Sequence, residues 1–321
     1  MIKILAVGDL HVKESTLATI AILNKKLLER IEEHNPNIVI FMGDLSDTHE
    51  KIHTLALNAI HDLLFSVSQH CQVYALIGNH DLVGPTLFLT KEHPFGTFGI
   101  DGKLHIVDVP MKFFGMLFVP YVPPGRFSEV LTNFDLNEIK LIWAHQEFCG
   151  ARSGSFVSDR GDPWTLPIPI ISGHIHEKQA LGRVTYIGTP YQTNYGESPN
   201  KTVALIDYDP DTGLQNIEEI SLGMPIKVTE SLDVAAAHIF TVPQGSDMRL
   251  KISGTCDEIA AFKKTAKACA LEAQAKVVYI LTDTKVPYAV KRAQKTFLDL
   301  LHEYGQPETE QVRQLLDEAL K

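Results

Sequence analysis

The sequence is poor in cysteine and contains no long apolar run. Its 321 residues include four cysteines (Cys71, Cys149, Cys256 and Cys269), and none of them lies in a C-x-x-C pair. This excludes a disulfide-stabilised scaffold, so we expect reduced thiols. No stretch approaches the roughly 18 consecutive apolar residues of a membrane span, and the strand-like segment 2–7 shows no cleavable leader pattern. We therefore expect a cytoplasmic protein without a membrane partner.

Basic side chains are also scarce. The chain has 29 Lys and Arg against 39 Asp and Glu, a formal net charge of −10. This balance argues against a protein that coats nucleic acid by bulk electrostatics alone. Residues 225–321 hold 13 basic and 13 acidic side chains, so residues 1–224 carry the whole acidic excess. We expect that part of the chain to bind something cationic.

The first two thirds of the sequence repeat one pattern. An apolar, β-branched run ends abruptly in a loop that is rich in Gly, Asp, Asn or His. The five runs are residues 2–7, 38–42, 73–77, 141–144 and 168–171. A helical stripe with 3- and 4-residue spacing lies between the first two runs, and prolines punctuate the region after residue 110. Strands that alternate with helices predict a layered α/β core, to which the proline-rich region adds a second sheet of mixed direction.

Turn and helix signals divide the rest of the chain. The turn at 209–213 is typical of a hairpin that would close a first domain, residues 1–224. Residues 225–284 follow as strand, strand, a helix over about 257–273, and strand, which predicts a small α+β domain. Residues 285–321 favour a C-terminal helical hairpin with an apolar stripe. This hairpin either packs on its own domain or is offered to a partner.

The loops after the five runs hold a set of carboxylate, amide and imidazole side chains. Because an α/β sheet gathers such loops along one edge, we expect these side chains to lie together. A mixed oxygen and imidazole set suits manganese, iron or zinc better than calcium. The candidates are too many for one ion, whereas two ions about 3.5–4 Å apart could share a bridging carboxylate and promote phosphoryl displacement. The sequence therefore predicts a binuclear phosphoesterase.

The motif order Asp-x-His, Gly-Asp, Gly-Asn-His-Asp, His and Gly-His-x-His resembles the calcineurin-like metallophosphoesterase superfamily over residues 1–190. The resemblance implies a β-sandwich flanked by helices and two divalent ions, expected to be Mn²⁺. Its implied ligand sets are Asp9, His11, Asp44 and His176 for one ion, and Asp44, Asn79, His145 and His174 for the other. It also implies that His80 is the catalytic acid and that Asp81 orients the His80 ring through its second nitrogen.

Within the superfamily, three segments are similar to SbcD-type DNA nucleases, which include the small subunits of phage recombination endonucleases. The segments are Gly-Asp-Leu-Ser-Asp-Thr at 43–48, Ser-Gly-His-Ile-His at 172–176 and Tyr-Ile-Gly-Thr-Pro-Tyr at 186–191. This resemblance implies an exonuclease or endonuclease in DNA recombination, repair or replication, located in the host cytoplasm if phage-encoded. It further implies that residues 225–284 form a DNA-capping domain and that the C-terminal helices bind an SbcC-type coiled-coil ATPase.

Several alternatives stay open. Ser46 replaces the bulky apolar residue of SbcD-type sequences, so a free-standing phosphatase or phosphodiesterase for small nucleotides is the alternative function. A non-catalytic assembly subunit is less compatible with the intact ligand set. A homodimer could use the apolar residues Leu55, Leu57, Ile60 and Leu64, which could equally belong to the core. The triplet 159–161 imitates a protein-phosphatase motif and is interpreted as a flexible loop, while His49 lies in no motif and is assigned no role.

Overall fold

A computed structural model describes residues 1–49, 51–98, 102–243 and 246–282 of the chain. The chain divides into two compact units. The first comprises Met1–Thr229 and Pro243–Arg249, and the second comprises Glu230–Val242 and the described residues from Leu250 onward. The C-terminal helical hairpin predicted for 285–321 lies outside the described residues. Among the described helices, none is both long enough and apolar enough to cross a membrane.

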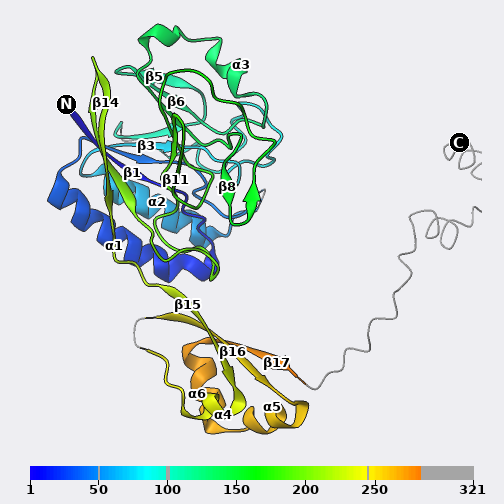
Figure 1. The fold of residues 1–321 in the computed structure, drawn as a ribbon. Helices are drawn as coiled ribbons and strands as arrows, with labels where there is room; N and C mark the ends of the chain where they lie inside the picture. The colour runs from blue at the N-terminus through cyan, green and yellow to red at the C-terminus, as the bar shows by residue number, and fades with distance from the viewer. Residues whose placement is uncertain (50, 99–101, 244–245, 283–321) are drawn as a thin grey trace, which may run out of the picture. The chain divides into compact units, whose positions relative to one another are not determined.

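A six-stranded sheet forms the first half of the first unit (Figure 1). Its order is β14-β13-β1-β2-β3-β4, and β1 to β4 run parallel, whereas β13 is antiparallel to both β1 and β14. The strands are β1 (Ile2–Val7), β2 (Ile38–Phe41), β3 (Gln72–Leu76), β4 (Leu104–Val107), β13 (Val203–Asp209) and β14 (Gly213–Ile220). The ends of β1, β2 and β3 carry three of the polar loops.

A second six-stranded sheet has the order β11-β12-β10-β7-β6-β5. Its four inner strands are parallel and its two edge strands antiparallel, the mixed direction that the sequence predicted. The strands are β5 (Met111–Phe113), β6 (Met116–Val119), β7 (Leu141–Ala144), β10 (Ile170–Ser172), β11 (Gln179–Leu181) and β12 (Val184–Tyr186). The predicted layered α/β class is thereby confirmed.

The alternation of side chains along β1 shows how the layers stack. Leu5 and Val7 pack in a core cluster with helices α1 (Leu17–His34) and α2 (Thr54–Ser68). Ile4 and Ala6 point the other way, into a cluster shared with the second sheet. Figure 1 shows α1 and α2 side by side next to the first sheet. Burial on both faces explains why these strands are continuously apolar and end where polar residues begin.

The outer face of the second sheet is covered by short elements. A third core cluster packs its strands against α3 (Phe127–Leu131). The remaining short elements of this unit are η1 (Glu14–Thr16), η2 (Leu136–Glu138), β8 (Arg152–Ser153) and β9 (Phe156–Val157). The side chains of Asp159 and Arg160, in the triplet that imitates a phosphatase motif, are 84% and 90% exposed.

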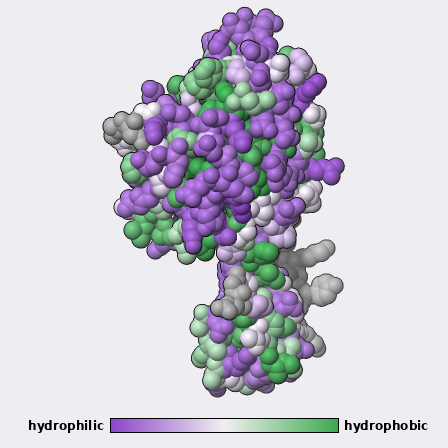
Figure 2. Space-filling model, turned by 90° about the vertical axis from the view of Figure 1, so that its left-hand side faces the viewer, coloured by the Kyte–Doolittle hydropathy of each residue, from purple (hydrophilic) through white to green (hydrophobic). Residues whose placement is uncertain are grey.

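The face of the first unit seen in Figure 2 is mainly hydrophilic. The homodimer prediction depends on how exposed the apolar side chains of α2 are. Of the four apolar residues named for a dimer contact, Ile60 and Leu64 are fully buried in the core and Leu57 packs against it. Leu55 is 52% exposed. A dimer through α2 would therefore have one of these four side chains available on the surface.

The second unit holds most of a three-stranded sheet of order β15-β16-β17 with three short helices. These elements are β15 (Lys227–Asp233), α4 (Val234–Ile239), β16 (Asp247–Gly254), α5 (Cys256–Phe262), α6 (Ala266–Gln274) and β17 (Lys276–Leu281). The single helix expected over about 257–273 is two helices. The break follows from Thr265, whose side chain accepts a hydrogen bond from the Ala268 backbone and caps α6 at a new start.

Candidate metal centre

The loops that follow β1, β2, β3, β7 and β10 converge on one site. They carry all seven side chains predicted as metal ligands: Asp9, His11, Asp44, Asn79, His145, His174 and His176. The chain packs tightly here, because a Cβ atom on Gly78 would lie 2.2 Å from both the backbone nitrogen and Oδ1 of Asp44. Three of the seven side chains, those of His11, Asp44 and His174, extend from left-handed backbone with φ of 46°, 48° and 75°.

One group of ligand atoms forms around His11 and His176. The two Nε2 atoms lie 2.9 Å apart, and a carboxylate oxygen of Asp9 lies within 4.8 Å of both imidazoles. Oδ2 of Asp44 is 3.6 Å from Nε2 of His11. Two nitrogens and carboxylate oxygens therefore point at a common place.

A second group forms around Asn79. Its Oδ1 lies 3.1 Å from Nε2 of His145 and 2.8 Å from Nδ1 of His174. Oδ1 of Asp44 is 3.3 Å from Nε2 of His145. Since Oδ2 of Asp44 faces the first group, this one carboxylate reaches both groups.

The electrostatics of this cluster fit bound cations. Oδ1 of Asp9 is buried and has no hydrogen-bond partner, although buried polar atoms are otherwise almost always paired. Burial opposes charge on His145, yet the charges of Asp44 and Asp9 outweigh it and raise the pKa of His145 to about 9. The pKa of Asp44 is lowered despite its burial, chiefly by the His145 charge. The carboxylates therefore need positive charge beside them, and divalent ions on these nitrogen and oxygen donors would supply it.

Three of the four ligand histidines have a partner behind the ring. Nδ1 of His145 donates to the Met42 carbonyl at 2.7 Å, which leaves Nε2 for the site. Nδ1 of His11 lies 3.4 Å from a carboxylate oxygen of Asp47. Nδ1 of His176 lies 3.1 Å from Oε1 of Glu197. Sequence analysis missed Asp47 and Glu197 because neither belongs to a ligand motif.

The predicted catalytic acid, His80, lies beside the ligand groups. Its backbone nitrogen donates to Oδ1 of Asp44 at 2.8 Å, and its ring stands edge-on to that of His11 at 4.9 Å. Its other face stacks on His49, with ring centroids 4.8 Å apart and planes at 17°. His49, which the sequence left without a role, is thus part of the site. The loop after β2 brings it there, and no local pattern signals that contact.

The structure differs from the role expected for Asp81. Nδ1 of His80 donates to the carbonyl oxygen of Asp47 at 3.0 Å, so the ring is oriented by backbone and not by the Asp81 carboxylate. The Asp81 carboxylate instead accepts hydrogen bonds from the backbone nitrogens of Leu45, Ser46 and Gly78. Oγ of Ser46 donates to it as well, at 3.0 Å. Asp81 therefore ties the loop after β2 to the loop after β3, and a small hydroxyl residue at position 46 completes that tie.

The titration of these two residues reflects their surroundings. Burial lowers the pKa of His80, and the charges of His11 and His49 act in the same direction against that of Asp44. Burial and the charge of Asp44 raise the pKa of Asp81 to about 6, against the hydrogen bonds from the backbone. The His80 imidazole therefore favours its neutral form until negative charge arrives nearby.

A buried carboxylate supports the loop that carries His145. Asp162 accepts hydrogen bonds from the backbone nitrogens of Gly125 and Phe127, both at 3.1 Å, and from Nε2 of Gln146 at 2.7 Å. Because Gln146 directly follows His145, this network fixes the start of the loop after β7. The role of Asp162 is structural.

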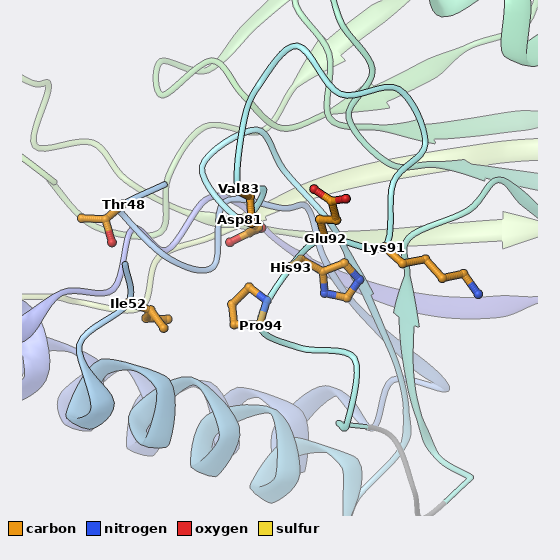
Figure 3. Close-up of a pocket in the computed structure, with 8 residues that line it drawn as sticks. All are labelled: Thr48, Ile52, Asp81, Val83, Lys91, Glu92, His93 and Pro94. Carbon is orange, nitrogen blue, oxygen red and sulfur yellow. The ribbon is translucent and has the colours of Figure 1, made fainter. Parts of the chain in front are cut away.

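A pocket of about 330 Å³ borders the Asp81 side of the site (Figure 3). Thr48, Ile52 and the segment 91–94 form its walls together with Asp81 and Val83. His93, on one wall, is 1% exposed, and its Nε2 lies 3.4 Å from a carboxylate oxygen of Asp108. The pocket offers room for a substrate group next to the loop that holds His80.

Comparisons with known proteins found a matching family model, two viral relatives and a distant solved structure. Residues 2–178 match the family model described as calcineurin-like phosphoesterase. Two relatives carry provisional phosphoesterase names. Protein 244L of Invertebrate iridescent virus 6 is 34% identical over 277 residues, which cover 82% of this chain and 97% of that protein. Protein 078R of Invertebrate iridescent virus 3 is 32% identical over 289 residues, covering 83% and 80%. Among solved structures, the Pseudomonas putida nuclease MPE is 16% identical with a TM-score of 0.32, over 63% of this chain and 83% of that one.

Proposed function

The chain belongs to the calcineurin-like phosphoesterase family, and from that premise we propose that it is a metal-dependent nuclease that hydrolyses DNA phosphodiesters. One observation carries the proposal. Two groups of ligand atoms share the carboxylate of Asp44, and a further histidine, His80, lies close to His11 and Asp44. We propose two divalent ions, Mn²⁺ by preference, for the two groups.

When bound, a pair of divalent ions would supply activated water and neutralise the charge of a phosphoryl group. The chain's own residues set the geometry of that chemistry. Asp44 reaches both groups, and the backbone of Gly78 packs so closely against it that a Cβ atom there would clash with Asp44. Asp9 and His145 are almost fully buried, so little solvent reaches their own donor atoms.

His80 explains why a phosphodiester is the proposed substrate. The leaving group of a phosphodiester is an alkoxide, which is a poor leaving group unless it receives a proton. Nδ1 of His80 is occupied by the Asp47 carbonyl, so Nε2 is the atom that would hold the proton to be donated. The imidazole would gain that proton together with the anionic substrate, whose charge raises a pKa that burial has lowered.

The choice of DNA is supported by the sequence motifs that are similar to SbcD-type nucleases. The segment 186–191 lies against the site, where the Tyr191 hydroxyl donates to the carbonyl of Leu10, between Asp9 and His11. With a net charge of −10, the chain has little basic surface of its own to hold DNA. We therefore also propose an SbcC-type ATPase as the partner that supplies part of the DNA-binding surface. The segment expected to bind it, 285–321, lies outside the described residues.

One assay separates this proposal from its main alternative. The purified chain with Mn²⁺ would be given a labelled DNA duplex, a single-stranded DNA circle and bis-p-nitrophenyl phosphate, with Asp44→Ala as the blank. We expect DNA cleavage that Asp44→Ala abolishes. Hydrolysis of the small ester alone would contradict the nuclease proposal and favour a free-standing phosphodiesterase. Cleavage of the circle would identify endonuclease activity.

A further inference from the structure

A buried ion pair lies behind one of the ligand histidines. The side chains of Glu197 and Lys201 are 8% and 4% exposed, and Oε2 of Glu197 is 3.1 Å from Nζ of Lys201. Charged side chains this deeply buried are rare because removing each charge from water costs several kcal/mol. The pair lies within the first unit, in the segment between β12 and β13. The cost of burying this ion pair suggests that the pair has a role beyond packing.

The contacts of Glu197 converge on the His176 imidazole. Its Oε1 is 3.1 Å from Nδ1 of His176 and also accepts from the Thr193 hydroxyl and from Nδ2 of Asn194 at 2.9 Å. Its Oε2 accepts from the Thr193 backbone nitrogen at 3.0 Å, besides Lys201. Both oxygens are thus fully used, and the carboxylate has no freedom to turn away from the ring.

This contact determines which nitrogen of His176 faces the ligand site. An ionised carboxylate can only accept, so Nδ1 of His176 must carry the proton. The lone pair is then on Nε2, the atom that lies 2.9 Å from Nε2 of His11. Lys201 holds the other end of the same residue, because its Nζ donates to the His176 carbonyl at 2.8 Å. The ion pair therefore contacts both the ring and the backbone carbonyl of His176.

The ligand histidines His145 and His176 are oriented in different ways. In the group around Asn79, the His145 ring rests on the backbone carbonyl of Met42, which no side-chain change can remove, while Nε2 of His174 lies 3.8 Å from a carboxylate oxygen of Glu147. In the group around His176, the ring depends on a charged side chain from a segment 21 residues away. A carboxylate behind a ligand imidazole raises the basicity of the imidazole and fixes its orientation.

We propose that Glu197, held in place by Lys201, is a positioning residue that sets the metal affinity of the group formed by Asp9, His11, Asp44 and His176. The proposal rests on the proposed function only in that the chain binds two ions. Glu197 touches neither substrate nor ion and acts through the His176 ring.

The test measures metal binding and not turnover. Chelator-treated protein would be titrated with Mn²⁺ by calorimetry, and free Mn²⁺ would be followed by electron paramagnetic resonance. In Glu197→Gln we expect one of two binding steps to weaken roughly 10- to 100-fold while the other stays unchanged. The weakened step should be the one that Asp9→Asn removes. The matched control is Glu177→Gln, because Glu177 also faces Lys201, at 3.5 Å, but does not contact the His176 ring.

A second variant separates positioning from folding. Glu197→Gln leaves Lys201 buried with less compensation, so the double variant Glu197→Gln/Lys201→Met removes that charge too. We expect the double variant to recover thermal stability without recovering the lost affinity. Nitrogen NMR of the imidazoles should also show His176 with its proton on Nδ1 in the wild type, and a mixture of the two neutral forms in both variants.

Three results would overturn the proposal. They are two unchanged binding steps in Glu197→Gln, equal weakening of both steps, and recovery of affinity in the double variant. Failure of the proposed function looks different. A wild type that binds two ions but leaves DNA intact would refute the nuclease assignment, while the titration would still decide the role of Glu197.

Discussion

Replacing Gly78 by alanine should disable the site through one methyl group. The new Cβ would lie 2.2 Å from both the backbone nitrogen and Oδ1 of Asp44, whereas ordinary contact begins at 3.4 Å. Asp44 would have to move by about 1.2 Å, and its left-handed backbone, with φ of 48°, has no alternative nearby. Displacing a reactive group by about 1 Å costs on the order of 10²-fold in rate, and overpacking costs about 1–3 kcal/mol of stability.

The assay for this prediction combines three measurements on Gly78→Ala. Thermal unfolding reports stability, Mn²⁺ titration reports the number of ions bound, and hydrolysis of bis-p-nitrophenyl phosphate reports turnover. Gly84→Ala is the matched control, because a Cβ at Gly84 meets nothing within 4 Å. The control should keep wild-type stability to within about 1 kcal/mol. Two bound ions and wild-type turnover in Gly78→Ala would refute the steric argument and the bridging role of Asp44.

Three further predictions concern other buried groups. His80→Ala should retain Mn²⁺ binding but lose about 10²- to 10⁴-fold in phosphodiester turnover, and near-normal turnover would exclude it as the acid. Asp162→Ala should lower the free energy of unfolding in urea by about 3–6 kcal/mol, because it leaves three hydrogen-bond donors unpaired. Asp159→Ala, at an exposed position, should leave that free energy unchanged. Equal stabilities of the two variants would contradict this prediction. Burial raises the pKa of Cys71 to about 11, so at pH 8 only about 1 in 1000 of its thiols is ionised. A thiol reagent should therefore modify the three exposed cysteines first. The reaction of Cys71 should accelerate as the pH rises toward 11.

Sequence patterns were sufficient for the strand ends and for the loops that follow them. A strand buried on both faces must be apolar throughout, so the first polar residue after it marks the edge of the sheet. This is why Asp9, Asp44 and Asn79 could be placed together before any coordinates. The second unit was partly predictable as well, although the Thr265 cap divided a helix that the apolar spacing alone made continuous.

The contacts that sequence analysis missed all depend on how loops approach one another. The family resemblance implied that Asp81 contacts the His80 ring, but the backbone nitrogens of Leu45 and Ser46 in the neighbouring loop donate to its carboxylate instead. The stacking of His49 on His80 and the approach of Glu197 to His176 join residues 31 and 21 positions apart through irregular backbone. Irregular segments have no periodicity from which such contacts could be derived.

Each ligand group draws on both sheets of the sandwich, and this has a consequence for biosynthesis. The first group needs His176 and the second needs His174, both of which follow β10 of the second sheet. During translation, the early loops with Asp9, Asp44 and Asn79 emerge from the ribosome long before either partner. An unfinished chain therefore cannot assemble the two proposed metal sites, and the proposed nuclease would stay inert until its fold is complete.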